Sequence, residues 1–246
     1  MSGPIELSVV IPMLNEADNV QLLWEELDAA LARIALRTEI IFVDDGSTDA
    51  TAGAVRAVMK SDPRVRLLRF EANAGLTAAF HAGYGAARGE IVVTIDADLQ
   101  NDPRDIERLL AALKDADAAV GYRRRRHDRW RKRIASRIAN AVRNRLTGED
   151  IRDSACSLRA MRRECLAAIP PYSGMHRFVP TLLRMAGFRV VEVPVSHRPR
   201  HLGRSKFGVW DRAVPAFVDL LVVRWMMRRT FRGQSRDVTQ GEDDIG

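Results

Sequence analysis

Strand-like and helix-like patterns alternate through the first 122 residues. Short runs rich in Val, Ile and Leu predict buried strands at 7–14, 39–43, 65–70, 91–95 and 118–121. The segments between them have helical periodicity at 17–36, 49–60, 76–88 and 103–114. Asp102 and Pro103 have the residue types of a helix N-cap and a first helical position. This alternation predicts the α/β class, with a mostly parallel central sheet flanked by helices.

The pattern changes after Tyr122. Apolar residues then recur at every fourth position, which predicts an amphipathic helix: Trp130, Ile134, Ile138, Val142 and Leu146. A strand is expected near 155–160, a helix at 176–186 and a strand at 188–195. We divide the chain into 1–122 and 123–212, two halves of a single domain, and 213–246, an amphipathic helix followed by a loose acidic tail.

The amino-acid composition bears on the class of the protein and on its location in the cell. Of 246 residues, 46% are hydrophobic, which is ample for a packed core, and two cysteines provide no disulfide framework. No leader pattern precedes the first strand, and the apolar run at 213–223 is too short to span a bilayer. We therefore expect a cytoplasmic protein. Its net charge of +7 indicates an anionic partner.

Acidic residues stand where the predicted strands end: Glu16, Asp44, Asp45, Asp96 and Asp98. The carboxyl ends of parallel strands share one edge of a sheet, so these like charges would repel unless a cation compensates. Mg²⁺ or Mn²⁺ takes such oxygen ligands together with substrate phosphates. Asp96 and Asp98 point to the same side if the strand remains extended there. Taken singly, the same stretches also fit a chance acid pair, a turn or a helix start; their joint occurrence favours the site.

Four segments resemble family 2 glycosyltransferases, which have a GT-A fold. They are "VVIPMLNEADN" (9–19), "IIFVDDGSTDAT" (40–51), "NAGLTAAFHAGYGAARGEIVVTIDADLQNDP" (73–103) and "AVGYR" (119–123). Further matches are similar to the branch that loads sugars onto polyprenyl phosphates, typified by dolichyl-phosphate mannosyltransferase. These are "WRKRIASR" (130–137), "DSACSLRAMRRE" (153–164), "MHRFVP" (175–180) and "VPVSHRPRHLGRSKFG" (193–208).

The resemblance implies a role for particular residues. The nucleotide of the donor would meet Pro12, Glu16, Asp44, Asp45, Asp96, Ala97 and Asp98, and a closing loop would supply Arg200, Ser205 and Lys206. The metal ion would be held by Asp96, Asp98 and Gln100. The acceptor phosphate would meet Arg123, Arg133 and Arg137. Catalysis would rest on Asp98, Arg200 and Lys206, while Asp153 is either a catalytic or orienting group or a structural cap.

The resemblance also implies an activity: metal-dependent, inverting transfer of a sugar from a GDP- or UDP-sugar to dolichyl or undecaprenyl phosphate. Residues 1–122 would then bind the nucleotide sugar and 123–212 the acceptor. A family 2 enzyme that acts on a sugar or protein hydroxyl is the alternative, and a non-enzymatic nucleic-acid-binding protein ranks low because it leaves the acidic strand ends unexplained. We therefore expect that the protein does not bind a nucleic acid.

Two segments are candidates for contact with an anionic membrane. Residues 122–145 contain eleven Lys or Arg and one Asp, which fits a solvated helix face, a nucleic-acid patch or a headgroup-binding helix. Residues 214–231 combine Trp225 and two methionines with Arg224, Arg228 and Arg229, and a helix packed on the domain is equally compatible. We expect peripheral attachment at the inner face of the membrane, direct or through a membrane-protein partner.

Overall fold

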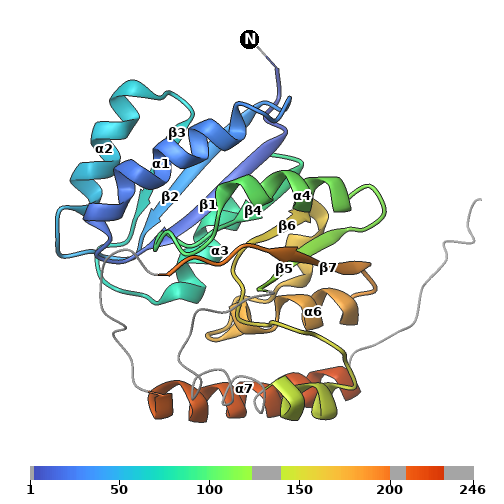
Figure 1. The fold of residues 1–246 in the computed structure, drawn as a ribbon. Coiled ribbons are helices and arrows are strands. Elements are labelled where there is room, and N and C mark those ends of the chain that lie inside the picture. The colour runs from blue at the N-terminus through green and yellow to red at the C-terminus, as the bar shows by residue number, and fades with distance from the viewer. Residues whose placement is uncertain (1–2, 124–139, 200–208, 230–246) are drawn as a thin grey trace, which may run out of the picture.

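A computed structural model describes residues 3–123, 140–199 and 209–229, with only the backbone of 209–214. Seven strands of these ranges form one sheet (Figure 1): β1 (Leu7–Met13), β2 (Thr38–Asp44), β3 (Val65–Arg69), β4 (Ile91–Thr94), β5 (Ala118–Arg123), β6 (Arg159–Arg162) and β7 (Val190–Val195). Their order is β3-β2-β1-β4-β6-β5-β7. The strands are parallel except for β6, which runs antiparallel to β4 and β5.

Helices cover both faces of the sheet (Figure 1). One apolar cluster contains residues of α1 (Ala17–Leu31), α2 (Thr51–Ser61) and α4 (Ile106–Ala112). The other contains residues of α3 (Leu76–Ala86), α6 (Val179–Met185) and α7 (Val209–Arg229). Neighbouring strand residues alternate between the two clusters, as Val9 and Val10 do, because successive side chains of a strand point to opposite faces. The expected α/β architecture, with a mostly parallel central sheet flanked by helices, is confirmed.

The strand order creates a switch point between β1 and β4. From β1 the chain winds outward through β2 to β3, and then returns to place β4 on the other side of β1. In open α/β sheets, ligands bind outside the carboxyl ends of the two strands that flank such a reversal. Because β6 is antiparallel, its first residue, Arg159, pairs with Thr94 at the end of β4. The loop that precedes β6 therefore reaches the same edge.

Most predicted elements occur within a few residues of their expected bounds. Asp102 accepts a hydrogen bond from the Arg104 amide at 3.0 Å and caps η1 (Pro103–Asp105), the short 3-10 helix that leads into α4. The strand expected near 155–160 lies later, at β6. The helix expected at 176–186 is divided into η3 (Met175–Arg177) and α6. A further 3-10 helix, η2 (Arg163–Ala168), was not predicted.

The second half of the chain is only partly described. Of the amphipathic stripe expected from Trp130 to Leu146, the structure describes helix 140–147, and the acidic tail lies outside the described residues. The division at residues 122 and 212 stays a prediction, although the sheet includes strands from both halves. Within the described ranges, no helix is both long enough and apolar enough to cross a membrane.

Candidate active site

The loops that follow β1 and β2 are hydrogen-bonded to each other. The Asn15 amide donates to Ser47 Oγ at 2.8 Å, and the Thr48 amide donates to Asn15 Oδ1 at 2.8 Å. The Glu16 amide donates to Thr51 Oγ1 at 2.9 Å. Asn15 has a φ of 53°, a left-handed conformation that Asn tolerates better than most residues. The "NE" and "DDGSTD" motifs thus form one structure at the sheet edge.

Both aspartates at the end of β2 have partners within the protein. Asp44 is fully buried, accepts from the Ser47 amide at 2.8 Å and pairs with Arg69 at 3.2 Å. Asp45 accepts from the amides of Ala74 at 2.8 Å and Gly75 at 3.0 Å. Asp45 therefore fixes the loop that enters α3 beside the switch point. Pro12, at the end of β1, lies in register with Val43 next to these residues.

Asp96 and Asp98 follow β4 in a turn. Both would lie on one side only if the strand remained extended, and this condition is not met, because β4 ends at Thr94 and the chain turns at 97–98. The Gln100 amide donates to Asp98 Oδ1 at 3.2 Å across Leu99, whose φ is 60°. The two carboxyl groups still interact, since burial and then the charge of Asp98 raise the pKa of Asp96 to about 6.

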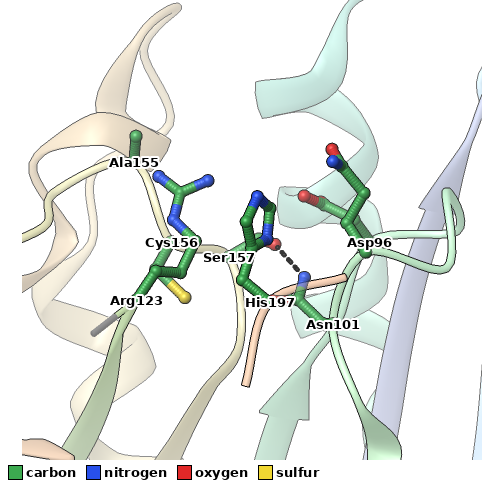
Figure 2. Close-up of a pocket in the computed structure, with 8 residues that line it drawn as sticks. Asp96, Asn101, Arg123, Ala155, Cys156, Ser157 and His197 are labelled. Carbon is green, nitrogen blue, oxygen red and sulfur yellow. Dashed lines mark hydrogen bonds between the residues drawn. The ribbon is translucent and has the colours of Figure 1, made fainter. Parts of the chain in front are cut away.

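Segments far apart in the sequence meet Asp96 in a small polar pocket. Its lining residues are Asp96, Gln100, Asn101, Arg123, Ala155, Cys156, Ser157 and His197. Figure 2 shows Asp96 and Arg123 entering from two sides, with His197 between them. The Asn101 side chain donates to Ser157 Oγ at 3.3 Å (dashed in Figure 2), and the Arg198 amide donates to Gln100 O at 2.9 Å. The pocket thus joins β4, β5, the loop before β6 and the segment after β7.

Arg123 and Asp153 form a bidentate ion pair on one side of this pocket. Arg123 donates from Nε to Asp153 Oδ2 at 2.6 Å and from Nη2 to Asp153 Oδ1 at 2.9 Å. The Arg123 amide also donates to Asp153 Oδ2 at 3.3 Å, so backbone and side chain are held together. The side chains are 13% and 6% exposed, respectively, which makes this a largely desolvated pair.

The donor set at the end of β4 fits a hard divalent cation. Two carboxylates, Asp96 and Asp98, and the amide oxygen of Gln100 are the ligand types that Mg²⁺ and Mn²⁺ accept. The raised pKa of Asp96 reports negative charge that a cation would neutralise. The described ranges contain no group of three or more His, Cys, Asp and Glu arranged to hold a metal ion. Mg²⁺ sites with only one or two protein carboxylates are usually completed by waters or substrate phosphates.

Several predicted residues lie outside the described part of the chain: Arg133, Arg137, Arg200, Ser205 and Lys206. The others, including Ala97 beside the acid pair, occupy the carboxyl edge of the sheet or the pocket that opens there. Sequence reasoning missed His197, Asn101 and Ser157 as lining residues. A signal was available for two of them, because Asn101 directly follows Gln100 and His197 precedes the expected closing loop by three residues.

The comparison with known families agrees with this arrangement. The model described as "Glycosyl transferase family 2" matches residues 8–169, which include both acidic strand ends and the loop before β6. The chain belongs to glycosyl transferase family 2. This family 2 protein is thus a glycosyltransferase, and its sheet has the GT-A architecture.

Curated relatives and solved structures are similar over most of this glycosyltransferase. A dodecaprenyl-phosphate galacturonate synthase of Rhizobium johnstonii is 38% identical over 91% of this chain and 68% of its own length. An undecaprenyl-phosphate 4-deoxy-4-formamido-L-arabinose transferase of Edwardsiella ictaluri is 38% identical over 82% of this chain and 63% of its own length. The chain thus spans about two thirds of these relatives.

Two solved structures share the fold at lower identity. Glucosyl-3-phosphoglycerate synthase of Mycobacterium tuberculosis, in complex with Mn²⁺, UDP and glucosyl-3-phosphoglycerate, matches with a TM-score of 0.65 at 22% identity. The match covers 89% of this chain and 80% of that one. A mannosyltransferase of Pyrobaculum calidifontis, in complex with GDP-Man and Mn²⁺, matches with a TM-score of 0.61 at 22% identity, over 92% of this chain and 70% of that one. These likenesses show the fold.

Proposed function

We propose that this protein transfers a sugar from a nucleotide sugar to a polyprenyl phosphate, with Mg²⁺ or Mn²⁺ at Asp96, Asp98 and Gln100. The names of both curated relatives, a dodecaprenyl-phosphate galacturonate synthase and an undecaprenyl-phosphate transferase, support the acceptor class. The donor base, uracil or guanine, and the inverting outcome remain predictions from the family resemblance.

The observation that carries the acceptor assignment is the Arg123–Asp153 pair. A sugar or protein hydroxyl must lose a proton as it attacks, so an enzyme that uses one benefits from a carboxylate base. Asp153 lies behind the pocket lining, and its two oxygens accept hydrogen bonds from the Arg123 guanidinium. Such engagement favours an orienting role for Asp153. A phosphate monoester near neutral pH is already ionised and needs placement more than deprotonation.

Arg123 has the chemistry for that placement. Its bonds to Asp153 use Nε and one side of Nη2, and a guanidinium carries five N–H donors in a fixed plane. Arg123 also lines the pocket that contains Asp96, and the planar, delocalised charge of a guanidinium suits an anionic phosphate oxygen there. By the family resemblance, Arg133 and Arg137 would complete the acceptor site.

The donor would lie across the switch point from the acceptor. Glu16 and the Asp45 loop would hold the nucleoside, and Asp96 and Asp98 would face the diphosphate. A bound divalent ion supplies positive charge to the departing nucleoside diphosphate. Arg200 and Lys206 would add to that charge by the resemblance. The carboxylates of Asp96 and Asp98 would thus hold the ion, while Arg123 would orient the attacking phosphate.

A direct transfer assay tests the proposal. Purified full chain with Mg²⁺ or Mn²⁺, undecaprenyl or dolichyl phosphate and a panel of UDP- and GDP-sugars should form a glycolipid. Chelation by EDTA should abolish the product, and added Mn²⁺ should restore it. If no donor and acceptor combination gives a glycolipid, the proposal is wrong.

An Asp153→Asn variant separates the phosphate acceptor from the hydroxyl alternative. We expect the KM for the lipid phosphate to rise because Arg123 loses its ionic partner, while kcat and its pH profile change little. Loss of a general base would instead lower kcat by about 10²–10⁴. The matched control is Asp115→Asn, which removes an exposed carboxylate outside the pocket.

The acceptor class also implies where the enzyme works. A polyprenyl phosphate resides in a bilayer, so we propose peripheral action at the cytoplasmic face of the membrane, attached directly or through a membrane-protein partner. The excess of basic residues supports attraction to an anionic surface. Cell fractionation with a high-salt wash would test this location.

A further inference from the structure

One face of α7 exposes a stripe of large apolar side chains. Each is between 44% and 62% exposed: Phe217, Val218, Leu221, Val222 and Trp225. Nine large hydrophobic residues are exposed in the described ranges. Five of these nine lie between Phe217 and Trp225 of α7. A contiguous exposed apolar surface of this kind marks an interaction site more often than scattered single residues do. We call these five residues the α7 stripe.

The helix is two-sided. At about 100° per residue, the α7 stripe occupies an arc of about 140°. Leu220 and Val223 lie on the opposite side, where they are 5% and 0% exposed and belong to the apolar cluster beneath the sheet. In Figure 1, α7 forms one edge of the molecule beyond α6, with helix 140–147 beside it. The α7 stripe therefore faces away from the domain.

The charges on α7 indicate what kind of partner contacts the α7 stripe. Residues 215–229 contain three arginines and one acid. Arg228 and Arg229 fall within the arc of the α7 stripe, one turn beyond Trp225. The acid, Asp219, lies outside that arc, and its carboxylate accepts from Arg177 Nη1 at 2.9 Å. An apolar face bordered by cations, with an exposed Trp, suits the headgroup boundary of an anionic bilayer.

A second copy of the chain fits less well. It would bring a further chain of net charge +7 to a face that already carries Arg228 and Arg229. Anionic lipid headgroups would instead attract Arg228 and Arg229. The length of the α7 stripe, about 12 Å at 1.5 Å per residue, is enough for shallow insertion parallel to the surface.

We infer that the α7 stripe is a membrane-docking surface that inserts into an anionic lipid layer with Arg228 and Arg229 at the headgroups. This inference deepens the proposed function, because it places the enzyme on the layer that holds the lipid acceptor. Docking itself requires no transfer reaction, so the two ideas can fail separately.

The test is flotation of the full chain with vesicles. Wild-type protein should float with mixed phosphatidylcholine and phosphatidylglycerol vesicles and much less with phosphatidylcholine alone. A Val218→Ser, Leu221→Ser, Trp225→Ser variant should lose at least about tenfold in partition, since each removed side chain forfeits apolar burial. Arg228→Glu with Arg229→Glu should lose the preference for phosphatidylglycerol.

A matched control uses exposed apolar residues on other helices. Leu22 of α1 and Met59 of α2 are 40% and 39% exposed, and Leu22→Ser with Met59→Ser should keep wild-type partition. Circular dichroism melting should show that all variants are folded. The inference is overturned if wild-type protein does not float with the mixed vesicles, or if the triple variant floats as well as wild type. It is also overturned if the control loses as much as the triple variant.

Activity assays keep the two proposals apart. On a short-chain polyprenyl phosphate in detergent, the triple variant should be as active as wild type, whereas on acceptor embedded in vesicles it should lose about tenfold, in line with its partition. Equal losses on both substrates would overturn the docking role. Wild-type protein that floats but transfers no sugar to either acceptor would refute the proposed function and leave docking standing.

Discussion

His176 Nδ1 lies 2.8 Å from Thr77 Oγ1, which links η3 to the first turn of α3 across 99 residues of sequence. The Gly174 amide donates to the same hydroxyl at 3.0 Å, so the hydroxyl proton is available to the imidazole. Arg159 Nη2 donates a hydrogen bond to the backbone carbonyl oxygen of His176 at 2.8 Å. Burial, together with the charges of Arg177 and Arg159, lowers the pKa of His176 to about 3.

Acid should destabilise the protein through His176. The pKa of its imidazole is about 6.5 when unfolded and about 3 when folded, so the unfolded chain binds more protons between these values. Stability contributed by the neutral ring is complete above pH 6.5 and falls as the pH drops toward 3. Urea unfolding at pH 7 and pH 5 should show a smaller loss in His176→Gln than in wild type. His81→Gln, at an exposed position of α3, should keep the wild-type loss; an equal loss in both variants would contradict the prediction.

Asp96→Asn should separate metal binding from folding. Because burial and the charge of Asp98 raise the pKa of Asp96, removal of its charge should leave the ligand-free protein as stable as wild type or more stable. Wild type with Mn²⁺ and a bound nucleotide should gain about 2.7 kcal/mol at 100 times the Kd, and the variant should lose that gain. Thermal-shift measurements with UDP and GDP, each with and without Mn²⁺, would show both effects. A variant that retains the Mn²⁺-dependent shift would exclude Asp96 as a ligand.

Glu39 should stabilise the fold without contributing to the site. Its buried carboxylate lies at the opposite edge of the sheet and accepts from Ser8 Oγ at 2.7 Å, Arg66 Nη1 at 2.7 Å and Arg88 Nη2 at 2.7 Å. Burial alone would raise the pKa of Glu39, but these hydrogen bonds lower it to about 2. The stability it contributes is therefore present above pH 4.5 and lost as the pH falls toward 2.

Glu39→Gln should cost about 2 kcal/mol in urea unfolding at pH 7, because the buried carboxylate loses its charge-assisted hydrogen bonds to the partly exposed Arg66 and Arg88. The remaining folded protein should keep the wild-type kcat. Glu90→Gln, at an exposed position next to β4, provides the control and should change stability by less than about 0.5 kcal/mol. A specific activity that falls with Glu39→Gln at temperatures where the variant is fully folded would argue against a purely structural role.

Gly46→Ala should disturb the nucleotide side of the site. Gly46 has a φ of +71°, and a Cβ there would lie 2.5 Å from the backbone of Ala72 and Asn73. Those residues lead directly into the amides that hold Asp45. We expect a loss of about 1–3 kcal/mol in stability and a higher KM for the donor. Gly53→Ala in α2 has open space and should instead stabilise by about 0.5–1 kcal/mol. An unchanged donor KM in Gly46→Ala would contradict the predicted role of the Asp45 loop.

Local patterns were sufficient for much of the fold. Alternation of apolar runs with helical segments predicted β1 to β5 and the helices between them. Such elements can be predicted because the hydrophobic periodicity of a strand or helix depends only on residues close together in the sequence. The cap at Asp102 was equally local. The bend after Thr94 was not predicted, since it depends on a left-handed Leu99 and a hydrogen bond to Asp98 rather than on apolar spacing.

The sequence by itself thus determined the acidic strand ends, their order along the chain and the family to which they belong. Only the tertiary structure decided that β6 runs antiparallel beside β4 and that Arg123 and Ser157 line one pocket with Asp96. It also decided that Asp153 holds Arg123, and which face of α7 stays exposed. The Arg123–Asp153 pair joins residues 30 positions apart in the sequence. Local periodicity does not predict such pairings, because they form only when strands and helices from the whole chain pack around a shared hydrophobic core.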